Sequence, residues 1–154
     1  MKIKASGGAQ KITPFLWFDG QAGAAAKFYT SVFKRAKILS QSPMSTTFQL
    51  EGQKFMALNG GPHFKFNEAV SFFVQCGTQR EVDYFWKKLT SGGGEESRCG
   101  WLKDKFGLSW QVVPSILGDL IGDDDEEKAG RAMQAMMKMK KLIIADLKKA
   151  HAGR

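Results

Sequence analysis

The polar residues best placed to contact a ligand lie in residues 99–114, CGWLKDKFGLSWQVVP. Gln111 follows Trp110 in an otherwise apolar run, and strand alternation groups Gln111 with Ser109. A buried amide must find hydrogen-bond partners, because each unpaired group costs about 1–3 kcal/mol. We therefore expect Gln111 to face a cavity and to bond Ser109, Ser71, ordered water or a neutral polar ligand. A glutamine bonded only within the core is the alternative.

The remaining residues of the expected pocket come from several strands. Alternation places Pro14 and Leu16 on the inward face of an early strand, and Phe15 and Trp17 would then pack behind it. Apolar walls with a few directional polar groups are typical of a small-molecule pocket, although they also describe a filled core. The expected pocket residues are Pro14, Leu16, Asn59, Ser71, Phe73, Trp101, Ser109 and Gln111.

The sequence offers few metal ligands and no nucleophile with an assignable base. A catalytic divalent metal needs about three imidazole, carboxylate or thiolate ligands. His151 lies near the end of the chain, and His63 follows Gly-Pro in a crossover, where we expect it at the surface. Cys76 and Cys99 lack metal-site spacing and are expected to be free buried thiols, which fits a reducing cytoplasm. We expect no metal and no other cofactor.

Composition indicates one globular domain. The chain has 154 residues, of which 43% are hydrophobic. No apolar run reaches the roughly 20 residues of a membrane span. Residues 1–10, MKIKASGGAQ, lack the apolar stretch of a secretory signal and are expected to be flexible. The net charge of +8 would suit nucleic-acid binding, but the basic residues are spread along the chain. We expect neither nucleic acid nor a membrane as a partner.

One order of elements occurs twice along the chain. A strand, a helix and three strands are expected at residues 11–20, 21–35, 36–42, 45–52 and 53–61. The same order is expected at residues 69–76, 78–94, 96–104 and 108–114, with one strand fewer resolved by the pattern. The apolar helix positions Ala25, Phe28, Tyr29 and Val32 recur 57 residues later as Val82, Phe85, Trp86 and Leu89. This repeat predicts two βαβββ modules.

Local signals refine the ends of these elements. Asp19 is expected to cap the first helix, and Thr78 with Glu81 has capping-box spacing at the second. After Pro114 the chain is expected to be helical, with a break near residues 140–142. The acidic run at residues 123–127 suits the N-terminus of a helix. The methionines that follow are expected to pack a core or a subunit interface.

The two modules resemble the vicinal oxygen chelate superfamily, which includes glyoxalases, dioxygenases and bleomycin-resistance proteins. The stretches ITPFLWFDGQAGAAAKFYTSVF, MALNGG and GWLKDKFGLSWQVVP are similar to its PhnB-like branch, labelled 3-demethylubiquinone-9 3-methyltransferase-like. The resemblance implies an α+β glyoxalase/bleomycin-resistance fold, with a curved mixed sheet around a cavity and C-terminal helices. It implies a single domain at residues 11–149, made of modules 11–62 and 68–113 and a helical tail 114–149.

Metal-dependent members of the superfamily carry His or Glu on four strands, and the resemblance maps these positions onto other residue types. They fall on Pro14, on Met56 or Ala57, on Ala69 or Ser71, and on Gln111. We therefore expect a metal-free, cytoplasmic small-molecule binding protein with an unknown ligand. The alternative is an enzyme of this superfamily that acts on a small metabolite. It would be a lyase, a dioxygenase or a methyltransferase, as the label of the branch suggests. The resemblance and the methionine-rich tail also imply a homodimer.

Overall fold

The computed structural model describes residues 10–154 as two compact units, divided between residues 65 and 66. Of the N-terminal segment expected to be flexible, residues 1–9 lie outside the described residues. Gln10 is described, and its side-chain amide exchanges two hydrogen bonds with the backbone of Lys54, each of 2.9 Å.

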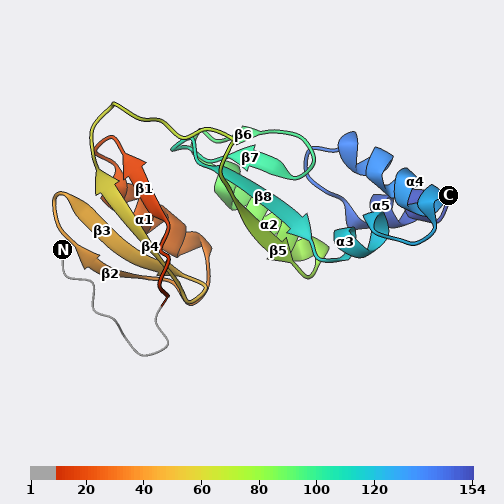
Figure 1. Ribbon diagram of the computed structural model, residues 1–154, viewed down its shortest axis with the longest axis horizontal. Helices are drawn as coiled ribbons and strands as arrows, with labels where there is room; N and C mark the ends of the chain where they lie inside the picture. The colour runs from red at the N-terminus through yellow and green to blue at the C-terminus, as the bar shows by residue number, and fades with distance from the viewer. Residues whose placement is uncertain (1–9) are drawn as a thin grey trace. The chain divides into compact units, whose positions relative to one another are not determined.

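The first unit contains one helix and four strands (Figure 1). These are β1 (Phe15–Phe18), α1 (Ala22–Val32), β2 (Lys37–Gln41), β3 (Ser45–Leu50) and β4 (Gln53–Asn59). Its strand order is β1-β4-β3-β2, with β1 parallel to β4 and the other pairs antiparallel. The β3–β4 hairpin turns at Glu51 and Gly52, whose φ angles of 50° and 80° are those of a type I′ turn.

The second unit repeats this arrangement and adds a helical tail (Figure 1). Its elements are β5 (Ser71–Cys76), α2 (Gln79–Thr90), β6 (Glu95–Glu96), β7 (Trp101–Lys103), β8 (Ser109–Pro114), α3 (Ile116–Ile121), α4 (Glu126–Met137) and α5 (Ile144–His151). The strand order β5-β8-β7-β6 is that of the first sheet, with β5 parallel to β8. The α+β fold with two βαβββ modules and C-terminal helices is confirmed.

The repeated apolar positions explain why each sheet is covered by its helix on one face. In the first unit Tyr29 stacks on Phe48, with ring centroids 6.0 Å apart, so the buried side of α1 meets β3. The positions predicted for the two helices are buried except for the equivalent pair Phe28 and Phe85, which are half-buried. Each sheet therefore keeps one face that its own helix does not cover.

Of the two helix caps predicted from sequence, the structure confirms one and contradicts the other. Thr78 Oγ1 accepts a hydrogen bond from Glu81 N at 3.2 Å, which confirms the expected cap of α2. The prediction that Asp19 caps α1 is wrong, because α1 starts at Ala22, beyond its reach. The Ala22 N–H instead donates to Asn59 Oδ1 at 2.8 Å. A residue on β4, distant in sequence, has taken the place of the local cap.

The tail forms its own small core on the second unit. Six buried residues form this core: Val113, Leu117, Leu120, Ala132, Leu142 and Leu147. The helices break between α4 and α5 at residues 138–143, as expected, and Asp125 caps α4 by accepting from the N–H groups of Glu127 and Lys128. Within residues 10–154, no helix has the length and apolar character needed to cross a membrane.

Candidate ligand-binding site

The second sheet has one face packed under α2 and one face that α2 does not cover. On the helix side, Trp86 of α2 donates to Glu96, and Phe72 packs edge-on against Trp110 with ring centroids 5.4 Å apart. Strand alternation turns the intervening residues the other way. We call this other side the open face. It is formed by Ser71, Phe73, Trp101, Lys103, Ser109 and Gln111.

Strand register arranges the open face in two rows that cross β5, β8 and β7. The first row is Ser71, Ser109 and Lys103, since Ser109 pairs with both neighbours. The second row is Phe73, Gln111 and Trp101. The structure thus brings five of the expected pocket residues onto one surface. The first row is polar, and the second is an amide between two aromatic side chains.

Gln111 is half-buried and is bonded across the face. Its Nε2 donates to Ser71 Oγ at 2.9 Å, one of the partners expected from sequence. The Gln111 Oε1 has no hydrogen-bond partner within residues 10–154. The amide is therefore oriented by the protein at its nitrogen and leaves an acceptor on the open face.

Ser109 is the least exposed polar residue of the face, with 1% of its surface accessible. Its Oγ has no hydrogen-bond partner in the described part of the protein. Buried polar side-chain atoms usually have a partner, and an unpaired one costs about 1–3 kcal/mol. This hydroxyl is thus an unused donor and acceptor in the middle of the polar row.

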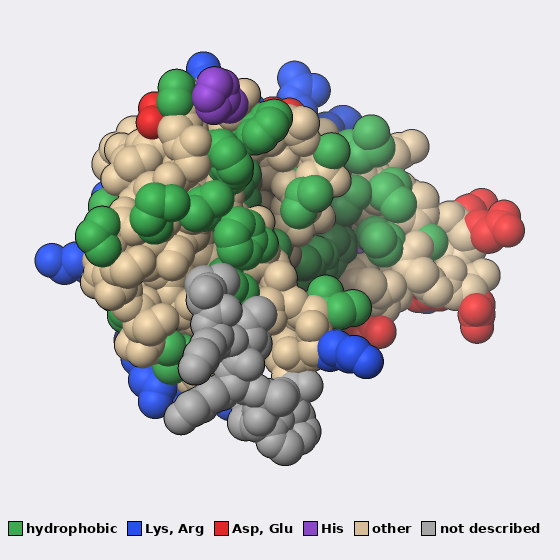
Figure 2. Space-filling model, turned by 60° about the vertical axis from the view of Figure 1, so that its left-hand side comes forward, with side chains coloured by type: hydrophobic (Ala, Val, Ile, Leu, Met, Phe, Trp, Pro, Cys, Tyr) green, Lys and Arg blue, Asp and Glu red, His purple; other side chains and the backbone are tan. Residues whose placement is uncertain are grey.

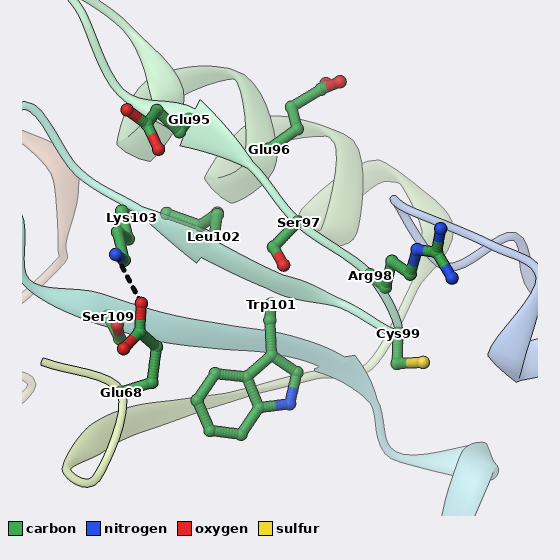
Figure 3. Close-up of a pocket in the computed structure, with 10 residues that line it drawn as sticks. All are labelled: Glu68, Glu95, Glu96, Ser97, Arg98, Cys99, Trp101, Leu102, Lys103 and Ser109. Atoms are coloured by element: carbon green, nitrogen blue, oxygen red, sulfur yellow. Dashed lines mark ion pairs between the residues drawn. The ribbon is translucent and has the colours of Figure 1, made fainter.

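A hollow of about 560 Å³ lies against this part of the second unit (Figure 3). Its lining includes Trp101, Lys103 and Ser109 from the open face, Ser97 after β6, and Glu68 from the segment before β5. In Figure 3 the side chain of Glu96 points away from Trp101, consistent with its bond to α2. The volume falls in the range of small-molecule sites.

Lys103 and Glu68, which both line the hollow, form an ion pair, and Figure 3 shows the Glu68 carboxylate directed at Lys103. The hydrogen bond from Lys103 lowers the pKa of the Glu68 carboxyl below its ordinary value, and the same bond raises the pKa of Lys103. Both groups are charged at neutral pH. Both side chains also remain accessible to solvent, so the pair contributes little to stability.

Sequence reasoning missed Glu68, Lys103 and Ser97 as lining residues. Alternation offered a signal for Lys103, which is two residues from Trp101 on the same strand. No sequence pattern indicates Glu68, because an irregular segment brings it to the sheet.

The remaining expected pocket residues belong to the first unit and have other surroundings. Leu16 pairs in register with Ala57 and is buried on the side of α1, so the expected orientation of the first strand is wrong. Phe15 and Trp17 lie on the opposite side. The Asn59 amide is bonded at both ends, to Ala22 N and to Pro43 O. The carbonyl of Pro14 accepts a hydrogen bond from Met56 N at 3.0 Å.

The first strand was misassigned because four apolar residues in succession, Phe15–Phe18, give no polar alternation to mark a face. The surface in Figure 2 shows that apolar side chains are not confined to the core. Phe15 is 51% exposed and Phe73 is 58% exposed.

The positions that correspond to metal ligands do not fit a divalent metal. Among the alternatives, Met56 and Ser71 lie on faces away from the helices, while Ala57 lies on the helix side. A thioether, a hydroxyl and the Gln111 amide supply neither imidazole nor negative charge. Within residues 10–154, no three His, Cys, Asp or Glu side chains form a possible ligand set.

None of the histidines and cysteines is among the residues of the open face. His63 is exposed, as expected, and His151 bonds Asp123 in the tail at 2.7 Å. Both cysteines are free: Cys76 is buried, and Cys99 is half-buried and lines the hollow. Burial raises the pKa of the Cys76 thiol to about 12, with a further contribution from the Glu81 charge.

Comparisons with known proteins agree with this architecture. A family model described as 3-demethylubiquinone-9 3-methyltransferase matches residues 10–113, which include both modules but not the tail helices. A PhnB protein from Bacillus cereus is 35% identical, with a TM-score of 0.63 over 69% of this chain and 100% of its own. No curated protein matches the chain.

Two more distant structures share the fold alone. A glyoxalase-related enzyme from Fulvimarina pelagi is 15% identical, with a TM-score of 0.51 over 70% of this chain and 91% of its own. A fosfomycin resistance protein from Listeria monocytogenes, solved with Mn(II) and sulfate, is 13% identical, with a TM-score of 0.52 over 66% and 86%. This chain therefore belongs to the 3-demethylubiquinone-9 3-methyltransferase-like (PhnB) family.

Proposed function

We propose that the protein binds a small organic molecule on the open face of the second sheet, without a metal. The observation that carries this proposal is the row Phe73, Gln111 and Trp101, in which two accessible aromatic side chains flank an amide. Rings offer apolar contact to a planar ligand, and a few directional polar groups fix its orientation.

The hydrogen-bonding groups of the open face define which polar groups the ligand must carry. One N–H of Gln111 Nε2 is used by Ser71, which orients the amide so that its Oε1 is available as an acceptor. That oxygen accepts a hydrogen bond from a ligand N–H or O–H, and the Ser71 hydroxyl can donate to a ligand carbonyl. A neutral amide, which has both a donor and an acceptor, satisfies the two groups together.

The lack of metal ligands supports a binding mode that uses only the protein's own groups. The four mapped positions carry no His, Asp, Glu or Cys. We also propose that the protein is a cytoplasmic homodimer. Its two free cysteines suit a reducing compartment, and the apolar side chains of α4 suit an interface.

The proposal is tested by thermal shift with a panel of aromatic amides and alcohols, with benzamide as reference. A bound ligand raises the melting temperature of the native state by mass action. We expect benzamide to stabilise the protein equally with and without EDTA. Gln111→Ala should lose this effect, whereas Gln53→Ala, at an exposed glutamine of the first unit, should keep it.

Two outcomes would contradict the proposal. No stabilisation by any panel compound would remove the evidence for a binding face. Stabilisation that requires added Zn²⁺ or Mn²⁺, or turnover of a panel compound that depends on such a metal, would favour the enzyme alternative instead.

A further inference from the structure

The polar row of the open face contains one donor that no protein group uses. Ser109 Oγ is buried and unpaired, and it lines the hollow beside Lys103, its partner in strand register. A buried hydroxyl without a partner is an unfavourable feature that a ligand acceptor would relieve. Its position beside an ammonium group specifies an acceptor that also carries negative charge.

The present partner of Lys103 is a carboxylate supplied by the protein itself. Lys103 lies on β7, between β6 and β8, whereas Glu68 comes from the irregular segment before β5. The Glu68 side chain is 61% exposed, and that of Lys103 is 36% exposed. Glu68 is thus the more accessible member of an ion pair that holds weakly at the surface.

We propose that the open face binds the carboxylate of an organic ligand on Lys103 and Ser109, and that Glu68 occupies this position in the free protein. This inference rests on the proposed function and adds the charged group that its ligand carries. On binding, the ligand carboxylate accepts from the Lys103 ammonium and from the Ser109 hydroxyl, and the Glu68 side chain turns into solvent. No covalent bond changes.

The two rows also set the distance between the ligand's polar groups. Ser109 and Gln111 are two residues apart on one strand, which separates their rows by about 6–7 Å. A ligand that spans both rows carries a carboxylate at one end and a neutral donor–acceptor group at the other, with a planar segment between them beside Trp101. A para-substituted aromatic acid has these dimensions. The net charge of +8 favours anions over cations at long range.

The test compares three probes that differ only at one end of the ring: 4-carbamoylbenzoate, its neutral diamide terephthalamide, and cationic 4-(aminomethyl)benzamide. Calorimetric titration should give dissociation constants near about 1 mM for such small compounds. We expect the carboxylate to bind at least about threefold more tightly than the diamide. Glu68→Gln should tighten carboxylate binding about two- to fivefold, because a competitor is removed.

Variants distinguish this mechanism from a general charge effect. Lys103→Gln should abolish the preference for carboxylate over diamide. Ser109→Ala should weaken carboxylate binding but leave the diamide unchanged. Glu51→Gln is the matched control, because it makes the same charge change in the other unit, at the surface ion pair with Arg35. It should leave all three dissociation constants unchanged.

The outcomes separate the two proposals. Equal binding of carboxylate and diamide, tighter binding of the cation, or an unaltered preference in Lys103→Gln would overturn the carboxylate site but not the binding face. If neither these probes nor benzamide binds, both proposals are overturned.

Discussion

The Nε2 atom of Gln111 donates to Ser71 Oγ at 2.9 Å, although Gln111 pairs in register with Phe73 and Ser71 pairs with Ser109. The bond therefore runs diagonally from one row of the open face to the other. It fixes the amide and uses one acceptor site of Ser71 Oγ, while Ser109 Oγ has no partner within residues 10–154. Within the described residues, one serine of the row is thus bonded by a side chain and the other is not.

The different roles of the two serines predict opposite effects on stability. Ser109→Ala removes an unpaired buried hydroxyl and should raise the free energy of unfolding by about 1 kcal/mol. Ser71→Ala breaks the bond to Gln111 and should lower it by about 0.5–1.5 kcal/mol. Urea unfolding of both variants measures this difference. Destabilisation by Ser109→Ala as large as that by Ser71→Ala would show that Ser109 has a partner in the free protein.

The cysteines should differ in reactivity toward iodoacetamide. Because burial raises the pKa of the Cys76 thiol to about 12, only about one thiol in ten thousand is ionised at pH 8. The thiolate is the reactive form, so native Cys76 should stay unmodified while half-buried Cys99 reacts. Both should react in urea. Peptide mass spectrometry identifies the sites, and faster native labelling of Cys76 would contradict its burial.

The tail should depend on one glutamine of α2. Gln79 Nε2 donates to Leu142 O at 3.1 Å, and Gln79 Oε1 accepts from Ile144 N at 2.8 Å, where α5 begins. Gln79→Ala should cost about 1–3 kcal/mol of stability and increase hydrogen exchange across α5. Its neighbour Arg80 is exposed, so Arg80→Ala should change neither the stability nor the hydrogen exchange of α5. Unchanged exchange in Gln79→Ala would mean that the apolar core alone holds the tail.

The exposed methionines of α4 motivate the proposed homodimer. Met133 and Met137 are 38% and 59% exposed and, four residues apart, share one side of the helix. Light scattering should give twice the chain mass of 17.1 kDa, and Met137→Glu should reduce it. A mass of about 17 kDa for the unaltered protein at micromolar concentration would contradict a dimer.

Sequence predicted which residues share a face in the second module better than in the first, for a physical reason. Alternating polar and apolar residues around Ser109 and Gln111 mark the two faces of β8, so the grouping of open-face residues followed from period-two spacing. The first strand, Phe15–Phe18, is apolar on both sides, and its face was assigned wrongly.

Contacts between residues distant in sequence also could not be predicted from the sequence. Asn59 binds the N-terminus of α1 from β4, a role that the nearby Asp19 was expected to have. Glu68 reaches Lys103 from an irregular segment, whose path no periodic pattern specifies. The repeat, by contrast, depends on local periodicity and was predicted correctly.

The central claim, that a small molecule binds on the open face of the second sheet, is tested most directly by nuclear magnetic resonance with benzamide. The indole N–H of Trp101 and the side-chain amide of Gln111 report on the face. Trp110 Nε1, which bonds Asp104 at 2.9 Å on the other side of the sheet, is an internal control. We expect the Trp101 and Gln111 signals to shift with one common dissociation constant while the Trp110 indole stays fixed. Saturable shifts elsewhere, with Trp101 and Gln111 unmoved, would contradict the claim.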